Sequence, residues 1–400
     1  MELRIPEGVK YQCTGCGQCC LGWPVPITED DYQRLRSLKF EEPQGALPAQ
    51  TCITKKDSQD PALGAFTRTL GKRSDGRCEF LSEDNRCQIH VEHGPELKPA
   101  MCQLFPYTFT ETPSGVYASV SFVSSGALLN AGQPLSEQEE LLSQKLDLYR
   151  SLFPDGSRDW SGIQLAAGFP LTWEEYMRLD AEFLHLLKMD DPARADKKLL
   201  ACSRYLVGQL PRGTNLERFP SVTARPKVVD QVLIQRCYEL YLSDDPYACS
   251  TVDLYTQAVL ADLMSPPEGG QLCLSDSKCG FNQLLSLRLG DLERDVEDLL
   301  SRFAYSKVFG KLYFGAGFAG LSVLAGVHHL LLLVALVRLK VKVLLVAENR
   351  SKPDVFEIAE IVRTLDRRLA HVSFSKDSSE VFELLLTSPE RLQRIVSLGA

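Results

Sequence analysis

The carboxyl-terminal two thirds of the chain has the pattern of amphipathic helices. From about residue 135 onward, apolar residues recur with a period of about 3.6 residues. Two capping boxes, Ser136 with Glu139 and Thr172 with Glu175, precede such stretches and mark helix starts. Further helices are predicted over residues 192–210, 226–243, 281–304, 354–370 and 378–386.

The amino-terminal third has a different pattern. It is rich in Gly, Pro, Cys and turn-forming residues and contains few long periodic apolar stretches. One short helix is predicted from Thr28, whose hydroxyl can cap the first turn, to about Leu38. Two short strands, 107–111 and 116–122, flank the turn sequence Thr112-Pro-Ser-Gly115 and predict a small hairpin.

Together these patterns predict a mainly α protein. We expect a loop-rich, cysteine-cluster domain with a small β-hairpin at residues 1–125, followed by an all-helical domain at residues 126–400. A chain of 400 residues is long enough for two such domains. The boundary is placed where the apolar pattern changes to the helical period.

Residues 312–337 contain no Asp, Glu, Lys or Arg. As a helix they would span about 39 Å, more than the hydrocarbon core of about 30 Å. Against a membrane helix stand His328 and His329 in mid-segment and the five glycines from Gly310 to Gly326. We expect a buried core helix around which the helical domain packs, with both histidines in structural roles.

The same region contains Gly315-Ala-Gly317-Phe-Ala-Gly320, which matches the dinucleotide-binding pattern. The stretch that ends at Glu348 imitates the second strand with its ribose-binding acid. The spacing from Gly315 to Glu348 is 33 positions, whereas the motif has about 20. Because the flanking segments have helical patterns, we do not expect a nucleotide or S-adenosylmethionine loop here.

Composition and charge exclude some function classes. Lys and Arg number 44 against 52 Asp and Glu, which gives a net charge of -8, and the chain has no run of five or six basic residues. This balance argues against nucleic acid and anionic membranes as partners. The first residues do not have the pattern of a secretory signal, so a cytoplasmic location is expected.

Cysteine is the residue type that points to chemistry. Of 13 cysteines, eight lie within the first 102 residues, and Cys13, Cys16, Cys19 and Cys20 form a CxxCxxCC run. Gaps of two residues let a turning backbone direct successive thiolates at one centre, and Gly15 and Gly17 allow such a turn. Cys78, Cys87 and Cys102 follow beside turn-forming residues, so the seven thiols exceed one tetrahedral site.

Other candidate ligands are weaker. Reduced cysteines in a core do not need this spacing, so ligation is the preferred interpretation of the cluster. Cys52 is an open candidate, whereas surface or outer-shell roles are preferred for His90 and His93. Four cysteines further along the chain are not expected to bind metal: Cys202, Cys237, Cys273 and Cys279.

These motifs resemble a known family. The CxxCxxCC run, the later Cys-x-Phe-Leu and Cys-x-Ile-His, and Lys98-Pro-x-x-Cys-x-x-Phe-Pro106 are similar to the zinc- or iron-chelating cysteine-cluster domain. That domain is also the amino-terminal part of flagellin lysine-N-methylase proteins, which the layout of this chain resembles. The similarity covers residues 11–125 and implies seven metal-facing residues: Cys13, Cys16, Cys19, Cys20, Cys78, Cys87 and Cys102.

Two positions depart from the pattern of the family. Relatives commonly have Arg where this chain has Lys98, and many have a cysteine just after the hairpin, where this chain has Ser124 and Ser125. If that cysteine is a ligand in relatives, this chain has one ligand fewer or uses Cys52.

The resemblance implies S-adenosylmethionine-dependent methylation of lysine side chains on a protein substrate, although no catalytic residue stands out. The alternative is a non-catalytic metal carrier, sensor or scaffold, and redox electron transfer would require a reducible cluster. Sulfur-only ligation suits both metals, and we expect an iron–sulfur cluster, with zinc as the alternative. The metal is expected to stabilise the amino-terminal fold.

Overall fold

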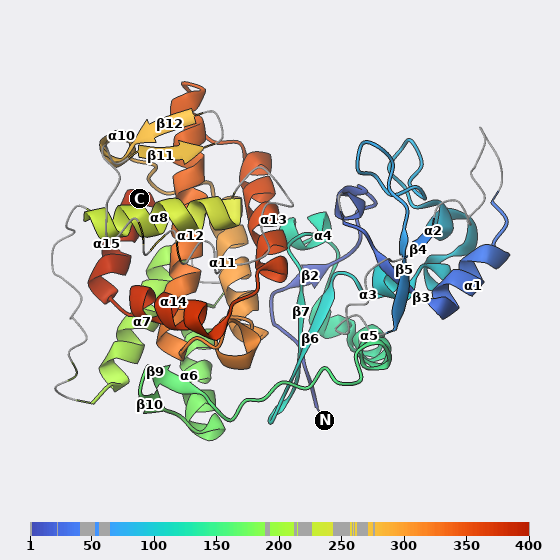
Figure 1. Ribbon diagram of the computed structural model, residues 1–400, viewed down its shortest axis with the longest axis horizontal. Helices are drawn as coiled ribbons and strands as arrows, with labels where there is room; N and C mark the ends of the chain where they lie inside the picture. Colours follow the sequence, from blue (N-terminus) through green and yellow to red (C-terminus); the bar gives the residue numbers. More distant parts are fainter. Residues whose placement is uncertain are drawn as a thin grey trace. The chain divides into compact units, whose positions relative to one another are not determined.

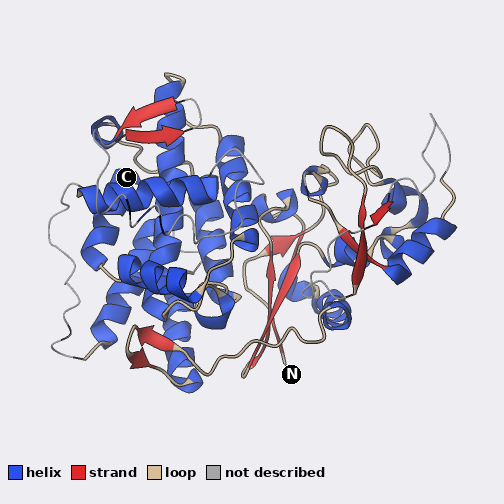
Figure 2. Ribbon diagram, viewed as in Figure 1, coloured by secondary structure: helices blue, strands red, loops and turns tan. Residues whose placement is uncertain are grey.

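The computed structural model describes residues 2–21, 23–40, 53–55, 65–188, 193–211, 214, 226–242, 257, 259, 261, 271–274 and 277–399. Helix is the main element type of these residues, and the strands form small sheets (Figure 2). The predicted mainly helical class is confirmed. Cys52 lies outside the described residues.

The chain divides into two compact units. The amino-terminal unit comprises Ile5–Phe109 and Ala118–Ser157, and the helical unit comprises Met1–Arg4, Thr110–Tyr117 and Arg158–Ala400. The division passes through one hairpin, since Thr110–Tyr117 belongs to the helical unit and the remainder to the amino-terminal unit. A compact unit is not a test of independent folding, so the domain boundary at residue 125 stays a prediction.

The helical unit contains most of the helix. Its helices are α6 (Trp173–Leu186), α7 (Ala195–Gln209), α8 (Val228–Leu242), α10 (Phe281–Ser286), α11 (Arg294–Phe309), α12 (Val323–Ala347), α13 (Val355–His371), α14 (Lys376–Leu386) and α15 (Pro389–Gly399), with the 3-10 turn η5 (Gly315–Gly317). Its strands are β1 (Leu3–Arg4), β9 (Gln164–Ala166), β10 (Phe169–Pro170), β11 (Gln271–Leu274) and β12 (Ser277–Gly280). The antiparallel pairs are β9 with β10 and β11 with β12.

Helix α12 is the core of this unit. Almost all of its side chains are buried, and α7, α13, α14 and α15 pack against it (Figure 1). Ser322 caps the helix by accepting a hydrogen bond from the Ala325 amide at 3.2 Å, and Glu383 of α14 accepts from the Ser322 amide at 2.9 Å. Within the described part of the chain, none of the helices combines the length and the apolar character that crossing a membrane requires.

Both histidines of α12 are structural, as predicted. His328 hydrogen-bonds to the Ser203 hydroxyl and to the Leu386 carbonyl, and His329 pairs with the Tyr241 hydroxyl at 2.9 Å. Burial lowers the pKa of His328 to about 4 and that of His329 to about 3. Neutral, hydrogen-bonded imidazoles are therefore part of the apolar core.

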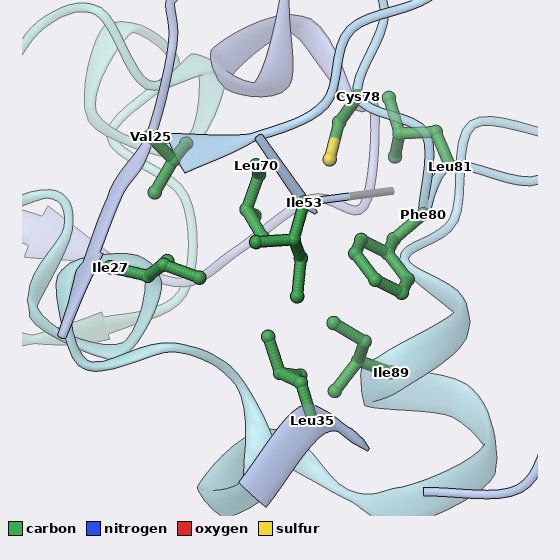
Figure 3. Close-up of a cluster of buried hydrophobic side chains, with 9 residues drawn as sticks. All are labelled: Val25, Ile27, Leu35, Ile53, Leu70, Cys78, Phe80, Leu81 and Ile89. Atoms are coloured by element: carbon green, nitrogen blue, oxygen red, sulfur yellow. The ribbon is translucent and has the colours of Figure 1, made fainter. Parts of the chain in front are cut away.

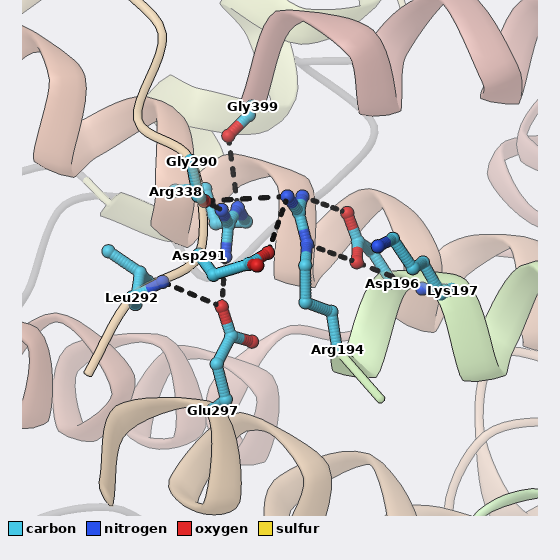
Figure 4. Close-up of polar contacts among 9 residues, drawn as sticks. All are labelled: Arg194, Asp196, Lys197, Gly290, Asp291, Leu292, Glu297, Arg338 and Gly399. Carbon is cyan, nitrogen blue, oxygen red and sulfur yellow. Dashed lines mark hydrogen bonds and ion pairs between the residues drawn. The ribbon is translucent and has the colours of Figure 1, made fainter. Parts of the chain in front are cut away.

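The buried Arg338 of α12 and the half-buried Arg194, which precedes α7, are each paired with a carboxylate (Figure 4). Arg338 donates to the Glu297 carboxylate at 2.6 Å, to the Gly399 carbonyl at 3.0 Å and to the Gly290 carbonyl. Arg194 forms a bidentate pair with Asp196, at 3.1 and 2.6 Å. The contacts of Arg338 join α12 to α11 and α15, and the pair of Arg194 with Asp196 lies at the start of α7.

The boundaries of three predicted segments were wrong. The segment 281–304 is two helices, because Gly290 has a left-handed φ of 66° and its carbonyl accepts from Arg338 and Arg194. The apolar helix expected over residues 312–337 begins at Val323 and runs on to Ala347. The Ser136 capping box is absent: Leu135–Glu137 forms the 3-10 turn η4, and Gln138 precedes the helix.

The glycine-rich sequence of the dinucleotide pattern forms a packed turn. Gly315–Gly317 is the turn η5, and a Cβ on Gly317 would overlap the Lys311 carbonyl oxygen. Beside this turn, the buried Lys311 ammonium binds both Asp180 oxygens, at 2.8 and 2.7 Å. The close approach of the Lys311 backbone therefore requires a residue without a side chain at Gly317.

The amino-terminal unit combines short strands, turns and small helices. Its strands are β2 (Lys10–Tyr11), β3 (Pro26–Thr28), β4 (Ile53–Lys55), β5 (Phe66–Leu70) and β8 (Gln133–Pro134). Its helical elements are η1 (Gln18–Cys20), α1 (Glu29–Ser37), α2 (Gln88–His93), η3 (Pro95–Leu97), α3 (Ala100–Leu104), α4 (Ser125–Leu128), η4 and α5 (Glu139–Leu152). The predicted hairpin is confirmed as β6 (Tyr107–Thr112) and β7 (Gly115–Val120).

One apolar cluster forms the core around the sheet of β3, β5 and β4 (Figure 3). Helix α1 contributes Leu35, and its predicted cap is present, since the Thr28 hydroxyl accepts from the Asp31 amide at 3.1 Å. The buried members are Val25, Ile27, Leu35, Ile53, Leu70, Cys78, Phe80, Leu81 and Ile89. This cluster, termed the sheet core below, includes one of the predicted ligands.

Candidate metal centre

The CxxCxxCC run lies in a loop that tightens into η1. Gly15 and Gly17 have left-handed φ values of 68° and 70°, which confirms the expectation that the turn needs glycine. The Cys20 amide donates to the Gly17 carbonyl at 2.9 Å, and a Cβ on Gly17 would be 2.9 Å from the Asn85 carbonyl oxygen. The loop is therefore packed closely on the turn just before Cys87.

Cys78 and Cys87 are delivered by two consecutive tight turns. Cys78 forms a backbone bridge with Lys72, and Cys87 forms one with Leu81. The Lys72 ammonium donates to the Cys20 carbonyl at 2.7 Å. Lys72 thus contacts both Cys78, through its backbone, and Cys20, through its side chain.

Cys102 is held by a clamp from helix α1. The buried Asp31 carboxylate accepts from the Ala100 amide at 3.0 Å, at the start of α3. Arg34 pairs with Asp31 and also donates to the Lys98 carbonyl at 3.2 Å. Residues separated by more than 60 positions in the sequence thereby position the segment that carries Cys102.

Four thiols share the sheet core. Cys78 belongs to it (Figure 3). Cys20, Cys87 and Cys102 pack against it from three further positions in the chain. Burial raises the pKa of Cys78 to about 11, raises that of Cys87, and, together with the neighbouring Cys20, Cys78 and Cys87, raises that of Cys102 well above its ordinary value. The pKa of Cys20 is raised first by its hydrogen bond with Cys19 and then by burial. These thiols are neutral unless a positive charge stabilises the thiolate form.

The other three thiols, which precede Cys20 in the CxxCxxCC run, are not among the residues that pack on the sheet core. Cys13 is exposed, and Cys16 and Cys19 are half-buried. The Cys16 sulfur lies 3.0 Å from the Ser125 hydroxyl oxygen, and the Cys19 sulfur lies 3.9 Å from that of Cys20. A hydrogen bond from Cys20 lowers the pKa of Cys19, whereas nearby Cys13 and Cys16 raise it.

The structure shows neighbouring thiols and not a finished coordination sphere. Among the residues it describes, no three His, Cys, Asp or Glu side chains are grouped so that they could hold one metal ion. The chemistry of the donor set nevertheless fits a metal. Zinc and iron both accept all-sulfur ligation, and either ion brings the positive charge that buried thiols need to become thiolates.

The weaker candidates take ordinary positions. His90 is largely exposed, and the partial desolvation of its ring, followed by the nearby charge of Lys98, lowers its pKa. His93 packs edge-on against Phe40, with ring centroids 5.1 Å apart. Cys202, Cys237 and Cys279 are buried. Their distance in sequence from the CxxCxxCC run and their burial in the helical unit are consistent with packing roles.

Comparison with known proteins supports the chelating interpretation. Residues 12–122 match the family model CxxCxxCC, described as "Putative zinc- or iron-chelating domain". The matched segment is a cysteine-cluster domain of this zinc- or iron-chelating type. It includes all seven predicted cysteines.

One curated relative is also similar in part. The uncharacterized protein MJ0939 of Methanocaldococcus jannaschii is 25% identical over 177 residues, which cover 42% of this chain and 56% of that protein. The chain therefore matches little more than half the length of this relative. No solved structure matches the chain.

Sequence reasoning missed the residues that support the thiols. Asp31 and Lys72 lie in none of the cysteine motifs, so the local sequence does not indicate that their side chains contact the segments of Cys102 and Cys20. Ser125 had a signal, since it stands near the position at which many relatives carry a cysteine, and it contacts Cys16. Such supporting contacts join distant segments, so local spacing does not reveal them.

Proposed function

We propose that the amino-terminal unit binds iron or zinc through thiolates of the predicted cysteines: Cys13, Cys16, Cys19, Cys20, Cys78, Cys87 and Cys102. One observation carries the proposal: thiols from four separate positions of the chain gather on the sheet core. An apolar core does not require four thiols, whereas soft metals are bound by several thiolates.

The surrounding residues suit this role. The sheet core shields one side of the thiols from water, and Asp31 and Arg34 hold the segment of Cys102. The positive charges of Lys72 and Lys98 oppose the rise in thiol pKa that the hydrogen bond with Cys19 and burial cause at Cys20. They would also offset the negative charge of a metal centre with several thiolates.

The bound metal would supply folding free energy and, if it is an iron–sulfur cluster, a redox centre. We favour iron–sulfur, with zinc as the alternative. Lysine methylation with S-adenosylmethionine on a protein substrate stays a prediction from the resemblance to flagellin lysine-N-methylases. A metal carrier, sensor or scaffold is the alternative role.

Anaerobic purification with metal and acid-labile sulfide analysis tests the proposal. We expect stoichiometric metal in the native protein and its loss in the double variant Cys78→Ser/Cys87→Ser. The control Cys202→Ala removes a buried thiol of the helical unit and is expected to retain the metal. Brown protein with labile sulfide identifies an iron–sulfur cluster, and colourless protein with zinc identifies the alternative.

Two outcomes would contradict the proposal. One is native protein that contains no iron or zinc after anaerobic preparation. The other is equal metal content in the double variant and in the native protein, because the metal would then be bound elsewhere.

A further inference from the structure

Lys72 contacts two segments of the chain that carry predicted ligands. It follows strand β5, and its backbone forms an antiparallel bridge with Cys78. Its side chain is half-buried, and the ammonium donates to the Cys20 carbonyl at 2.7 Å. A residue outside the cysteine motifs thus joins the end of the CxxCxxCC run to a cysteine that lies far from it in the sequence.

A second contact holds the same two segments together. Leu21, directly after Cys20, forms an antiparallel bridge with Arg77, directly before Cys78. The backbone therefore joins the segments even without the side chain of Lys72. What the side chain adds is a positive charge at the place where the two segments meet.

The charge of Lys72 is not balanced by a carboxylate, whereas that of its neighbour Arg73 is. The Arg73 guanidinium pairs with the Glu79 carboxylate at 3.6 Å and donates to the Glu79 carbonyl at 3.1 Å. Within the described part of the chain, the Lys72 ammonium forms no ion pair. A half-buried cation of this kind is stabilised by an anionic neighbour, and thiolates are anions.

The thiols on both sides of Lys72 are within reach of its charge. Burial raises the pKa of Cys78, and the Lys72 charge opposes that rise. At Cys20 the hydrogen bond with Cys19 and burial raise the pKa, and the Lys72 charge again opposes the rise. The same ammonium therefore stabilises negative charge on sulfur in both segments.

We propose that Lys72 is a positioning residue of the metal centre: its ammonium fixes the peptide of Cys20 beside the Cys78 segment and supplies the counter-charge of the thiolates. This inference rests on the proposed metal-binding function. Lys72 does not act as a ligand, since it works through its bond to a carbonyl and through its charge. The loss of such a supporting residue typically lowers metal affinity about 10- to 100-fold.

The rate of metal release tests the proposal. Full-length protein is purified anaerobically with the iron or zinc that it holds, and release to a coloured chelator is followed at about 0.1 M and about 1 M salt, where the screening length is about 10 Å and about 3 Å. Lys72→Arg keeps the charge and a donor, Lys72→Gln keeps only a donor, and Lys72→Met keeps neither. The matched control Lys39→Gln removes an exposed lysine of the same unit.

We expect Lys72→Gln to release metal about 10-fold faster than the native protein at the lower salt concentration, and Lys72→Met to release it faster still. The ratio of the Lys72→Gln rate to the native rate should fall at the higher salt concentration, because the native charge is then screened. Lys72→Arg and Lys39→Gln should release metal at the native rate. Lys72→Gln and Lys72→Arg keep the test decisive if Lys72→Met does not fold.

Different failures identify different errors. If Lys72→Gln and Lys72→Met release metal at the native rate, Lys72 is not a positioning residue. If the ratio for Lys72→Gln is equal at both salt concentrations and Lys72→Arg does not restore the native rate, Lys72 is a structural tether and its role as counter-charge is wrong. In both cases the proposed function stands, because the native protein holds metal. If the native protein binds no metal, the proposed function itself is wrong.

Discussion

At the scale of single residues, Asp31 accepts hydrogen bonds at the starts of two helices. Its carboxylate accepts from the Thr28 amide at 3.2 Å as part of the cap of α1, and from the Ala100 amide at 3.0 Å at the start of α3. It also pairs with Arg34, and it is 1% exposed. Loss of the carboxylate would leave all three donors without this acceptor.

We predict that Asp31→Ala lowers the free energy of unfolding of the amino-terminal unit by about 2 to 3 kcal/mol, since hydrogen bonds to a buried charged group are lost. Urea denaturation measures the effect, and metal retention should fall with it. The control Asp30→Ala removes an exposed neighbouring carboxylate and should change stability by less than about 0.5 kcal/mol. Equal stability of the two variants would contradict this role.

His329 is a second residue with a measurable consequence. Its folded pKa is lowered to about 3 by burial, from an ordinary value of 6.5. The unfolded chain therefore binds a proton that the folded chain does not bind as the pH falls below about 6.5. The stability that the neutral ring contributes is present above that pH and is lost progressively as the pH falls toward the folded pKa.

We predict that His329→Gln weakens the pH dependence of the helical unit, because the amide can hydrogen-bond to Tyr241 but does not titrate in this range. Urea unfolding at about pH 7 and about pH 5 should show a smaller loss of stability in the variant than in the native protein. An identical loss in both proteins would show that this ring does not contribute.

At the scale of elements, the sequence predicted two helix starts correctly from their capping residues. The capping boxes at Thr28 and Thr172 form as predicted, with the Thr172 hydroxyl accepting from the Glu175 amide at 3.2 Å. The hairpin was predicted from two short strand-like segments and the turn sequence that ends at Gly115. In these cases the determining contacts lie within a few residues of one another.

Long-range contacts decided the elements that were predicted wrongly. Gln138 donates to the Tyr11 carbonyl at 3.1 Å, and the 3-10 turn before it replaces the predicted cap at Ser136. Gly290 lies between α10 and α11, where its carbonyl accepts from Arg338 of α12 and from Arg194, which precedes α7. A local pattern contains no information about such partners.

The glycine-rich turn before α12 gives a test at this scale. We predict that Gly317→Ala destabilises the helical unit by about 1 to 3 kcal/mol, since the added Cβ overlaps the Lys311 carbonyl and forces a backbone shift. Thermal unfolding measures it. Gly208→Ala on α7, where a Cβ meets nothing within 4 Å, should be neutral or slightly stabilising. A Gly317 variant as stable as this control would refute the packing role.

At the scale of the whole molecule, the sequence predicts which cysteines bind metal but not which of them lie near one another. The two-residue spacing and the glycines of the run indicated ligation, and the left-handed turns at Gly15 and Gly17 agree with that reasoning. The grouping depends on which scaffold each segment joins: Cys78 lies in the sheet core, and Cys16 contacts Ser125 of α4. Only the folded chain shows these neighbours.

Extended X-ray absorption fine structure of the bound metal, which measures the distances to its ligand atoms, tests the central claim most directly. We predict that anaerobically purified protein gives a first shell dominated by sulfur at about 2.3 Å, as thiolate ligation requires. A first shell made only of nitrogen or oxygen at about 2.0 to 2.2 Å would contradict thiolate ligation by the amino-terminal unit.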